Sequence, residues 1–309
     1  MSSLNTNVAA MTALQTLNQT NKEMLVTQNR ISTGLRVKDA SDNAAYWSIA
    51  TTMRSDNMSV STVQDALGLG AATADVTVTA MNNAIDAVSK IKAKLVAARA
   101  PGLDRAKIQS EIAALQTELR STAESAVFSG ENWLNVDSTG PLTKTVVSSF
   151  SRDSTGAITI GTIEVDVGPT GTMLFDTSGN NQGVLDFERT TTGNGTTYSV
   201  TTIDISALTD AALDLQDIED MIQGVDDALG AMTDAATVLG AAKSRINLQK
   251  DFVSKLIQSI DTGIGQLVDA EMNEESTRLQ ALQVRQQLGV QALGIANQSA
   301  QQILRLFQS

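Results

Sequence analysis

The C-terminal region carries an unbroken heptad pattern, and this pattern constrains the fold more than any other feature of the chain. Its positions are alternately four and three residues apart, a spacing that keeps one seam of an α-helix facing a partner helix. The seam positions are Val268, Met272, Glu275, Leu279, Leu282, Gln286, Gly289, Leu293, Ala296, Ala300, Ile303 and Phe307. From Gln286 to Leu304 no residue is charged. We therefore expect this helix to be covered on most sides.

The N-terminal region has the same character, because no residue from Met1 to Asn21 is charged. Its apolar residues recur at Leu4, Val8, Met11, Leu14, Leu17, Met24, Ile31 and Leu35. Both ends of the chain are thus long, uncharged and amphipathic. We expect them to pair as helices, in an antiparallel or a parallel orientation.

A membrane span is the obvious rival interpretation of these uncharged ends. A spanning helix needs about 20 predominantly apolar residues. Polar residues exclude this near the N-terminus, at Asn5, Thr6, Asn7, Thr12, Gln15, Thr16, Asn18 and Gln19. A secretory signal peptide is not expected either, because the start lacks a basic segment followed by a compact apolar one.

The composition excludes several classes of function. The formal net charge of −12 argues against nucleic acid as a partner, since phosphate binding requires basic patches. The chain has no Cys and no His, which rules out disulfides, thiolate nucleophiles, the usual zinc sites and His-based catalysis. Only 3% of residues are aromatic, and small aliphatic side chains suit close helix packing. We expect no catalytic residue, metal or cofactor.

Helical periodicity divides the chain into two arms around a different middle. In the first arm we expect helices from residue 3 to about 35, 44 to 98 and 103 to about 124, the last with Ile108, Ile112, Leu115 and Leu119 on one face. In the second arm we expect a helix from 210 to about 224, and then a continuous one from about 226 to the C-terminus. A stripe of Ile and Val from Ile246 to Ile264 shifts register before Val268. Such a stutter predicts the boundary between two helical layers.

The middle of the chain is rich in Thr, Ser, Gly and Val, and it alternates in the manner of strands at Ile158/Ile160 and Ile163/Val165/Val167. The pair Asn194-Gly195 predicts a hairpin with a type I′ turn. We predict a small antiparallel β-rich insertion from about Asp137 to Ile205. A disordered linker is the alternative, against which the alternating Val and Ile argue. The expected fold is mainly α, with a long coiled-coil rod formed by both termini and a small β-rich outer domain.

Several motifs then resemble one family in the family's own order. Asn29–Ala45, with the sequence NRISTGLRVKDASDNAA, resembles the N-terminal signature of bacterial flagellins, as does the opening Ser3–Asn7. Leu239–Asn247 and Ala296–Leu306 resemble the family's C-terminal segments. Asn43–Ile49 is similar to the form seen in flagellins of rhizobium-like bacteria.

The resemblance implies a structural subunit of the flagellar filament, a hollow helical tube that serves as a propeller for swimming. Residues 1–38 and 266–309 would form its inner coiled-coil layer, 39–136 and 206–265 a second helical layer, and 137–205 a variable outer domain. The implied route is type III export to an extracellular filament. The implied partners are further copies of the chain, other flagellin subunits, the hook–filament junction protein, the filament cap, an export chaperone and the export apparatus.

We expect the subunit interface to include the apolar seam residues and a charged group near the end of the first helix. In the charged group, Arg30, Arg36 and Lys38 would form inter-subunit ion pairs with Asp39 and Asp42. The apolar candidates are Leu4, Val8, Met11, Leu14, Leu17, Met24, Ile31, Leu279, Leu282, Leu293, Ala296, Ala300, Ile303 and Phe307.

Two other classes of function remain as alternatives. A secreted coiled-coil effector or adhesin would use the same helices against a different partner, and failure to polymerise on filament seeds would favour it. The other alternative is an enzyme that carries a metalloprotease insertion with an H-E-x-x-H motif. This chain has no His, so it cannot form that motif. The acidic cluster between Asp210 and Asp227 has helical rather than calcium-loop spacing, so we expect a solvated helix face.

Overall fold

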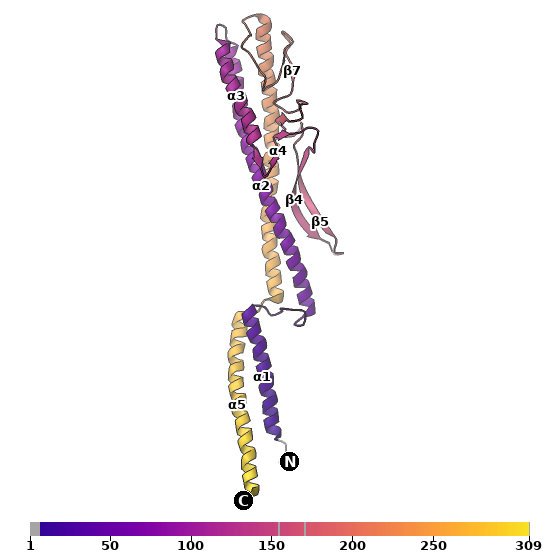
Figure 1. The fold of residues 1–309 in the computed structure, drawn as a ribbon, viewed down its shortest axis with the longest axis vertical. Helices are drawn as coiled ribbons and strands as arrows, with labels where there is room; N and C mark the ends of the chain where they lie inside the picture. Colours follow the sequence, from indigo (N-terminus) through magenta and orange to yellow (C-terminus); the bar gives the residue numbers. More distant parts are fainter. Residues whose placement is uncertain (1–6, 154, 170, 309) are drawn as a thin grey trace. The chain divides into compact units, whose positions relative to one another are not determined.

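The computed structural model describes residues 7–153, 155–169 and 171–308, with side chains as far as residue 299. The chain forms two compact units, residues 1–57 with 258–309 (unit 1) and residues 58–257 (unit 2). Helices α2 (Ala44–Ala98) and α4 (Ala212–Val268) contribute to both units (Figure 1). The expected fold class, mainly α with a β-rich insertion, is confirmed.

Unit 1 is built on α1 (Val8–Thr33) and α5 (Met272–Gln308). Asn7 caps α1, because its side chain accepts a hydrogen bond from the Ala10 amide at 3.0 Å. Gly34 ends the helix in a left-handed conformation at φ 71°, and its amide donates to the Arg30 carbonyl. The predicted loop follows, and α2 begins at Ala44 as expected.

Residues 269–271 separate α4 from α5, so the predicted continuous helix to the C-terminus is wrong. The break lies immediately after Val268, where the register of the apolar stripe shifts. The segment that follows α1 stabilises this break through backbone hydrogen bonds. The Ala270 amide donates to the Gly34 carbonyl at 2.9 Å, and the Arg36 amide donates to the Val268 carbonyl at 2.7 Å. A small core of Val37, Ala50, Ile264 and Val268 lies beside it. These backbone bonds and this core replace the helical bonds that the break gives up.

The predicted helix end near Gly224 is also wrong, because α4 continues through it. Glycine costs a helix only about 1 kcal/mol relative to alanine. Its role here is close packing, since a Cβ atom at Gly224 would lie 2.4 Å from the hydroxyl of Tyr198.

Unit 2 packs α2, α3 (Arg105–Ser125) and α4 around one core. On the predicted apolar face of α3, Ile112 and Leu119 are fully buried, and Ile108 and Leu115 pack against the core, which confirms that face. The small aliphatic content of the chain is used as expected, with alanines filling many positions between the helices.

The middle segment contributes one long hairpin and several very short strands. The hairpin pairs β4 (Thr143–Arg152) with β5 (Ile158–Asp166) antiparallel, with an irregularity between Val147 and Ser149. β1 (Val127–Phe128) pairs with β2 (Glu131–Asn132), and β7 (Arg189–Thr190) with β8 (Thr197–Tyr198), both antiparallel. β3 (Asn135–Val136) and β6 (Phe175–Asp176) pair in parallel, so not every pairing is antiparallel.

The hairpin predicted at Asn194-Gly195 is confirmed, because the Thr191 amide donates to the Thr196 carbonyl at 2.9 Å between β7 and β8. The predicted type I′ turn is wrong. Such a turn needs two consecutive residues at positive φ, and in this loop only Gly195, at φ 70°, adopts it.

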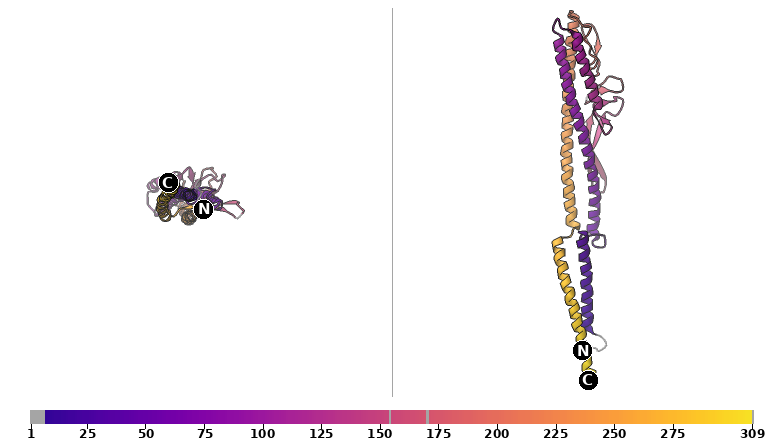
Figure 2. Two further views of the ribbon diagram at one scale, coloured as in Figure 1. Left: turned by 90° about the horizontal axis from the view of Figure 1, so that it is seen from below. Right: turned by 60° about the vertical axis from the view of Figure 1, so that its left-hand side comes forward.

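The β-rich segment shares the core of the helices. A Cβ atom at Gly70 of α2 would lie 2.5 Å from Cγ1 of Val146, so β4 packs directly against that helix (Figures 1 and 2). The hydroxyl of Tyr198 donates to the Asp220 carbonyl of α4 at 2.6 Å. The apolar residues that this segment gives to the common core include Trp133, Leu134, Val165, Leu174, Phe175, Leu185 and Ile203.

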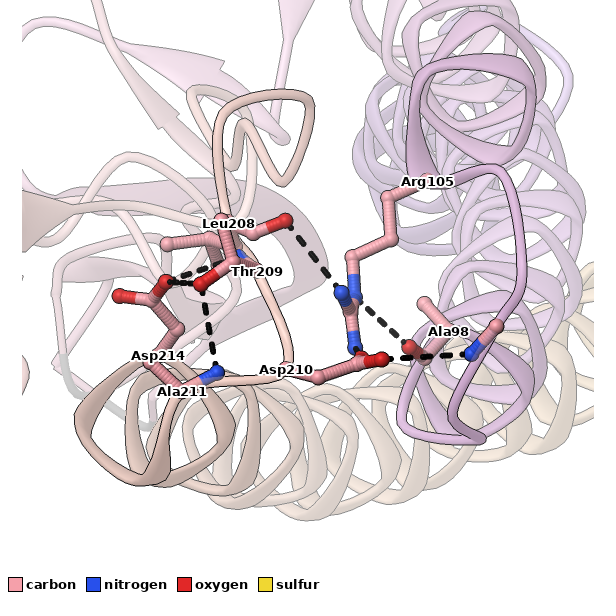
Figure 3. Close-up of polar contacts among 8 residues, drawn as sticks. Ala98, Arg105, Leu208, Thr209, Asp210, Ala211 and Asp214 are labelled. Carbon is pink, nitrogen blue, oxygen red and sulfur yellow. Dashed lines mark hydrogen bonds and ion pairs between the residues drawn. The ribbon is translucent and has the colours of Figure 1, made fainter.

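Arg105 joins three segments of unit 2 at its first helical position in α3 (Figure 3). Its guanidinium donates to the Ala98 carbonyl at 3.0 Å, to the Leu208 carbonyl at 3.3 Å and to Oδ1 of Asp210 at 2.6 Å. Only 7% of its surface is exposed. The hydrogen bond from Arg105 also holds the pKa of Asp210 below its usual value. The end of α2, the start of α3 and the approach to α4 are thereby fixed together.

The expected solvated face of the acidic cluster is wrong for the residues that face the β7–β8 loop. Asp217 is fully buried, and it accepts hydrogen bonds from the backbone and side-chain nitrogens of Asn194 at 2.9 and 2.7 Å. Asp220 accepts from the amide and hydroxyl of Thr192 at 2.6 and 2.7 Å. Within the described residues no group of acidic side chains is arranged to hold a metal ion. These carboxylates anchor a loop.

Candidate assembly interface

Helices α1 and α5 pack against each other along unit 1, and their polar contacts fix the orientation. Nδ2 of Asn7 donates to the Ala296 carbonyl at 2.9 Å. Nε2 of Gln286 donates to Oδ1 of Asn21 at 2.9 Å. Nη1 of Arg30 donates to Oε1 of Glu275 at 3.0 Å. Residue numbers rise along α1 as they fall along α5, so the pair is antiparallel.

The predicted seam of α5 faces α1 of the same chain. Leu282 is buried, and the remaining positions from Leu279 to Ala296 are half-buried. Gly289 has a specific use here, since a Cβ atom at this position would lie 3.2 Å from Cδ1 of Leu17. The empty seam position therefore admits a leucine of the partner helix.

The seam of α1 includes residues that the apolar pattern missed. Leu17, Met24 and Ile31 are half-buried, in keeping with their heptad spacing. Small side chains complete the seam at Ala10, Ala13, Thr20 and Thr27, of which the two threonines are buried. These residues alternate three and four apart with the predicted ones. That spacing is the signal that could have identified them, had alanine and threonine been counted as seam residues.

Other predicted interface residues lie outside this intramolecular seam. Val8, Met11 and Leu14 are exposed, Met11 at 63%. Exposed apolar residues also occur elsewhere on both helices, and we call the whole set the outer apolar residues. It consists of Val8, Met11, Leu14, Leu25, Val26, Met272, Val284, Leu288, Val290 and Ile295, of which Met272 is a predicted seam position of α5. Leu4 and the side chains of Ala300, Ile303 and Phe307 lie outside the described residues.

The charged candidates contribute to local structure. Arg30 pairs with Glu275, which is only 4% exposed, and Arg278 approaches the same oxygen at 3.3 Å. Arg36 donates to the Leu267 and Gln266 carbonyls at 3.0 and 3.3 Å, so it caps the end of α4, where cations interact favourably with the helix dipole.

Lys38, Asp39 and Asp42 shape the turn before α2. Oδ2 of Asp42 accepts the Lys38 amide at 2.9 Å, and Oδ1 of Asp39 accepts the Ser41 amide at 3.0 Å. The hydroxyl of Ser41 also donates to Asp39, and this hydrogen bond is the main reason that the pKa of Asp39 is lowered. All three residues are exposed, so their predicted pairing with a neighbouring subunit stays a prediction.

None of the helices in the described part of the chain has the length and hydropathy that a membrane crossing requires. The antiparallel pair of long helices, its heptad seam and its outer apolar residues define a structural protein that associates through helices. Comparison with known proteins identifies the family. Residues 4–139 match the bacterial flagellin N-terminal helical region, and residues 222–307 match the bacterial flagellin C-terminal helical region.

Full-length relatives agree with both matches. The chain is 48% identical over 324 residues to "Flagellin C" of Rhizobium meliloti (strain 1021), with all of both chains covered. It is 45% identical over 311 residues to a "Flagellin" of Brucella melitensis biotype 1, with 99% of each chain covered. It is 44% identical over 395 residues to "Flagellin A" of Rhizobium meliloti (strain 1021), with 99% of this chain and all of the relative covered. The chain belongs to the flagellin family and is a structural subunit of the bacterial flagellar filament.

Proposed function

We propose that α1 and α5 form the inner layer of the filament and that the outer apolar residues are the contacts between subunits there. The observation that carries this proposal is that the seam between α1 and α5 is already filled within one chain, while large apolar side chains remain exposed on the same helices, such as Ile295 at 67%. A monomer leaves these residues in water, and neighbouring copies would cover them.

For the remaining layers we propose the division predicted from the sequence. Residues 39–136 and 206–265 would form the second helical layer, and 137–205 would face outward. The chain also divides into a terminal and a central compact unit, although the division falls at 57/58 and 257/258 rather than at 38/39 and 265/266. The shared core of unit 2 means that the outer segment would be carried by the second layer as part of one folded body.

For the location and the partners we propose those that the flagellin family implies. We propose that the chain is exported to the extracellular filament by the flagellar type III apparatus with the help of a chaperone. It would assemble beneath a distal cap, begin at the hook–filament junction protein, and polymerise with itself or with other flagellin subunits. We propose no catalytic activity, which the lack of His and Cys in the sequence supports.

Seeded polymerisation tests the assignment of the outer apolar residues. In Leu288→Asp, an exposed leucine of α5 becomes charged, so the monomer should keep wild-type helix content while elongation on filament fragments is lost. Burying an unpaired charge at an interface costs several kcal/mol. In Leu293→Asp the charge lies in the seam, and both helix content and elongation should fall. Leu288→Met is the matched control and should elongate normally. Normal filaments from Leu288→Asp would rule out this contact.

A further inference from the structure

One side of the α1–α5 pair carries a groove in which positive charge is concentrated. It has a volume of about 500 Å³, and both helices line it. Four of its lining side chains are basic, namely Lys22, Arg30, Arg278 and Arg285, against a single acidic one, Glu23. The chain as a whole has a net charge of −12, so the excess of basic side chains in this groove is opposite in sign to the overall charge.

Contacts within the chain satisfy only part of this charge. Arg30 and Arg278 share the buried Glu275, and Arg278 also lies 2.8 Å from Glu274. Arg285 lies 3.9 Å from Glu23, the outer limit of an ion pair, and its side chain is 65% exposed. Lys22 is exposed as well. Lys22 and Arg285 are therefore the cations best placed to meet an anionic partner.

A complementary acidic surface lies at the break between α4 and α5 of the same unit. Asp269 and Glu271 are both exposed there, whereas Glu274, which follows on α5, already pairs with Arg278. About ten residues of helix separate Glu271 from the middle of the groove near Ala281, which corresponds to roughly 15 Å at 1.5 Å per residue. The intervening helix keeps Asp269 and Glu271 away from the groove of their own chain.

We propose that the groove binds the acidic break of a second copy of this chain, in a parallel neighbour displaced by roughly 15 Å along the helices. The inference rests on the proposed assembly through α1 and α5, and it specifies a register for it. Charge complementarity of this kind selects partner and register and raises the association rate more than it raises affinity. The outer apolar residues would supply the area, and the charges would select one offset between copies.

Charge reversal in the full chain tests the proposal. Lys22→Glu with Arg285→Glu should slow seeded elongation at least tenfold, and Asp269→Lys with Glu271→Lys should do the same. All four substitutions in one chain should restore elongation to within about threefold of wild type, because the pairs re-form with opposite sign. Lys22→Arg with Arg285→Lys keeps the positive charge of the groove and should elongate at the wild-type rate.

Cross-linking tests the offset directly, because the chain has no cysteine of its own. Glu271→Cys with Ala281→Cys in one chain should give covalent multimers when filaments are oxidised, and each single substitution should give none. A bond within one chain is excluded, since its two Cα atoms would lie roughly 15 Å apart and a disulfide requires less than about 7 Å.

The outcomes separate this inference from the assembly on which it rests. Failure of wild-type chains to elongate on seeds would contradict the proposed function. If wild-type chains elongate normally but the fourfold variant is not rescued, the proposed role of the groove is overturned while the proposed assembly stands. The same holds if filaments of the double cysteine variant form no multimers on oxidation.

Discussion

Nη1 of Arg30 lies 3.0 Å from Oε1 of Glu275, and that carboxylate is almost completely enclosed between α1 and α5. Its other oxygen, Oε2, is buried with no hydrogen-bond partner within the described residues. A buried polar pair in a helix seam fixes the register of the two helices at a cost in stability. The Arg30–Glu275 pair therefore specifies one register for the antiparallel alignment of α1 and α5.

Breaking this pair from one side should destabilise unit 1. Glu275→Met leaves Arg30 without its buried partner, so we expect a loss of about 1–3 kcal/mol in the free energy of unfolding. Arg30→Met with Glu275→Met should recover part or all of that loss, because an apolar pair needs no desolvation of charge. Urea unfolding of the monomer followed by circular dichroism measures both variants. A double variant less stable than Glu275→Met would contradict the prediction.

Two glycines of α2 should respond to alanine with opposite signs. A Cβ atom at Gly70 would lie 2.5 Å from Cγ1 of Val146, whereas nothing lies within 4 Å of one at Gly68. Gly70→Ala should lower the free energy of unfolding by about 1–3 kcal/mol through overpacking, and Gly68→Ala should raise it by about 0.5–1 kcal/mol through helix propensity. Urea midpoints measure both. Adding Val146→Ala to Gly70→Ala should relieve the clash, and a purely additive loss would contradict this explanation.

Loss of the Arg105 guanidinium should weaken the junction between α2, α3 and α4. Arg105→Ala removes three hydrogen bonds from a buried site and leaves two backbone carbonyls without their donor. We expect a loss of about 2–4 kcal/mol in the free energy of unfolding. The matched control is Lys107→Ala on the same helix, where the side chain is 85% exposed and the change should stay within about 0.5 kcal/mol. Equal effects in the two variants would contradict the role of Arg105 in holding this junction together.

The loop between β7 and β8 should depend on pH through Asp217. Burial alone would raise the pKa of this carboxyl, but hydrogen bonds from Asn194 and Thr191 outweigh it and hold the pKa below its usual value of 3.8. Because the pKa is lower in the folded state than in the unfolded chain, the carboxylate stabilises the fold at pH values above 3.8. This contribution is lost as the pH falls through the folded pKa.

Comparison of Asp217→Asn with wild type tests this dependence. The variant should unfold at lower urea concentration than wild type at pH 6, and the difference should shrink as both are taken below pH 3.8. Asp234→Asn, at an exposed position of α4, should show no such dependence. A difference between wild type and Asp217→Asn that grows on acidification would reverse the assigned sign.

The helical arms could be predicted from sequence because their apolar residues repeat at helical spacing over many turns. The break at residues 269–271 could not, although the register shift before Val268 points to its position. The break depends on backbone hydrogen bonds from Ala270 to Gly34 and from Arg36 to Val268, which join segments far apart in the chain. Gly224 misled the prediction for a similar reason, because its partner Tyr198 belongs to a distant strand.

The candidate interface was predictable on α5 and only partly on α1. Three leucines mark the seam of α5, whereas α1 uses Ala10, Ala13, Thr20 and Thr27 beside its larger residues. Small side chains carry little hydrophobic signal, yet they allow two helices to approach closely. The charged candidates were predicted as partners in ion pairs between subunits. The sequence pattern could not show that Arg36 caps α4 or that Arg30 pairs with Glu275 of the same chain.

The shared core of unit 2 limits how the length of this protein could change in evolution. The alignment with "Flagellin A" of Rhizobium meliloti (strain 1021) extends over 395 residues, against 309 in this chain. Residues such as Leu174, Phe175 and Leu185 complete the packing of the helices, so they must be retained or replaced in kind. Added sequence would enter at solvent-facing turns, as between β4 and β5. The same turns would be the places to graft a foreign peptide for display along a filament.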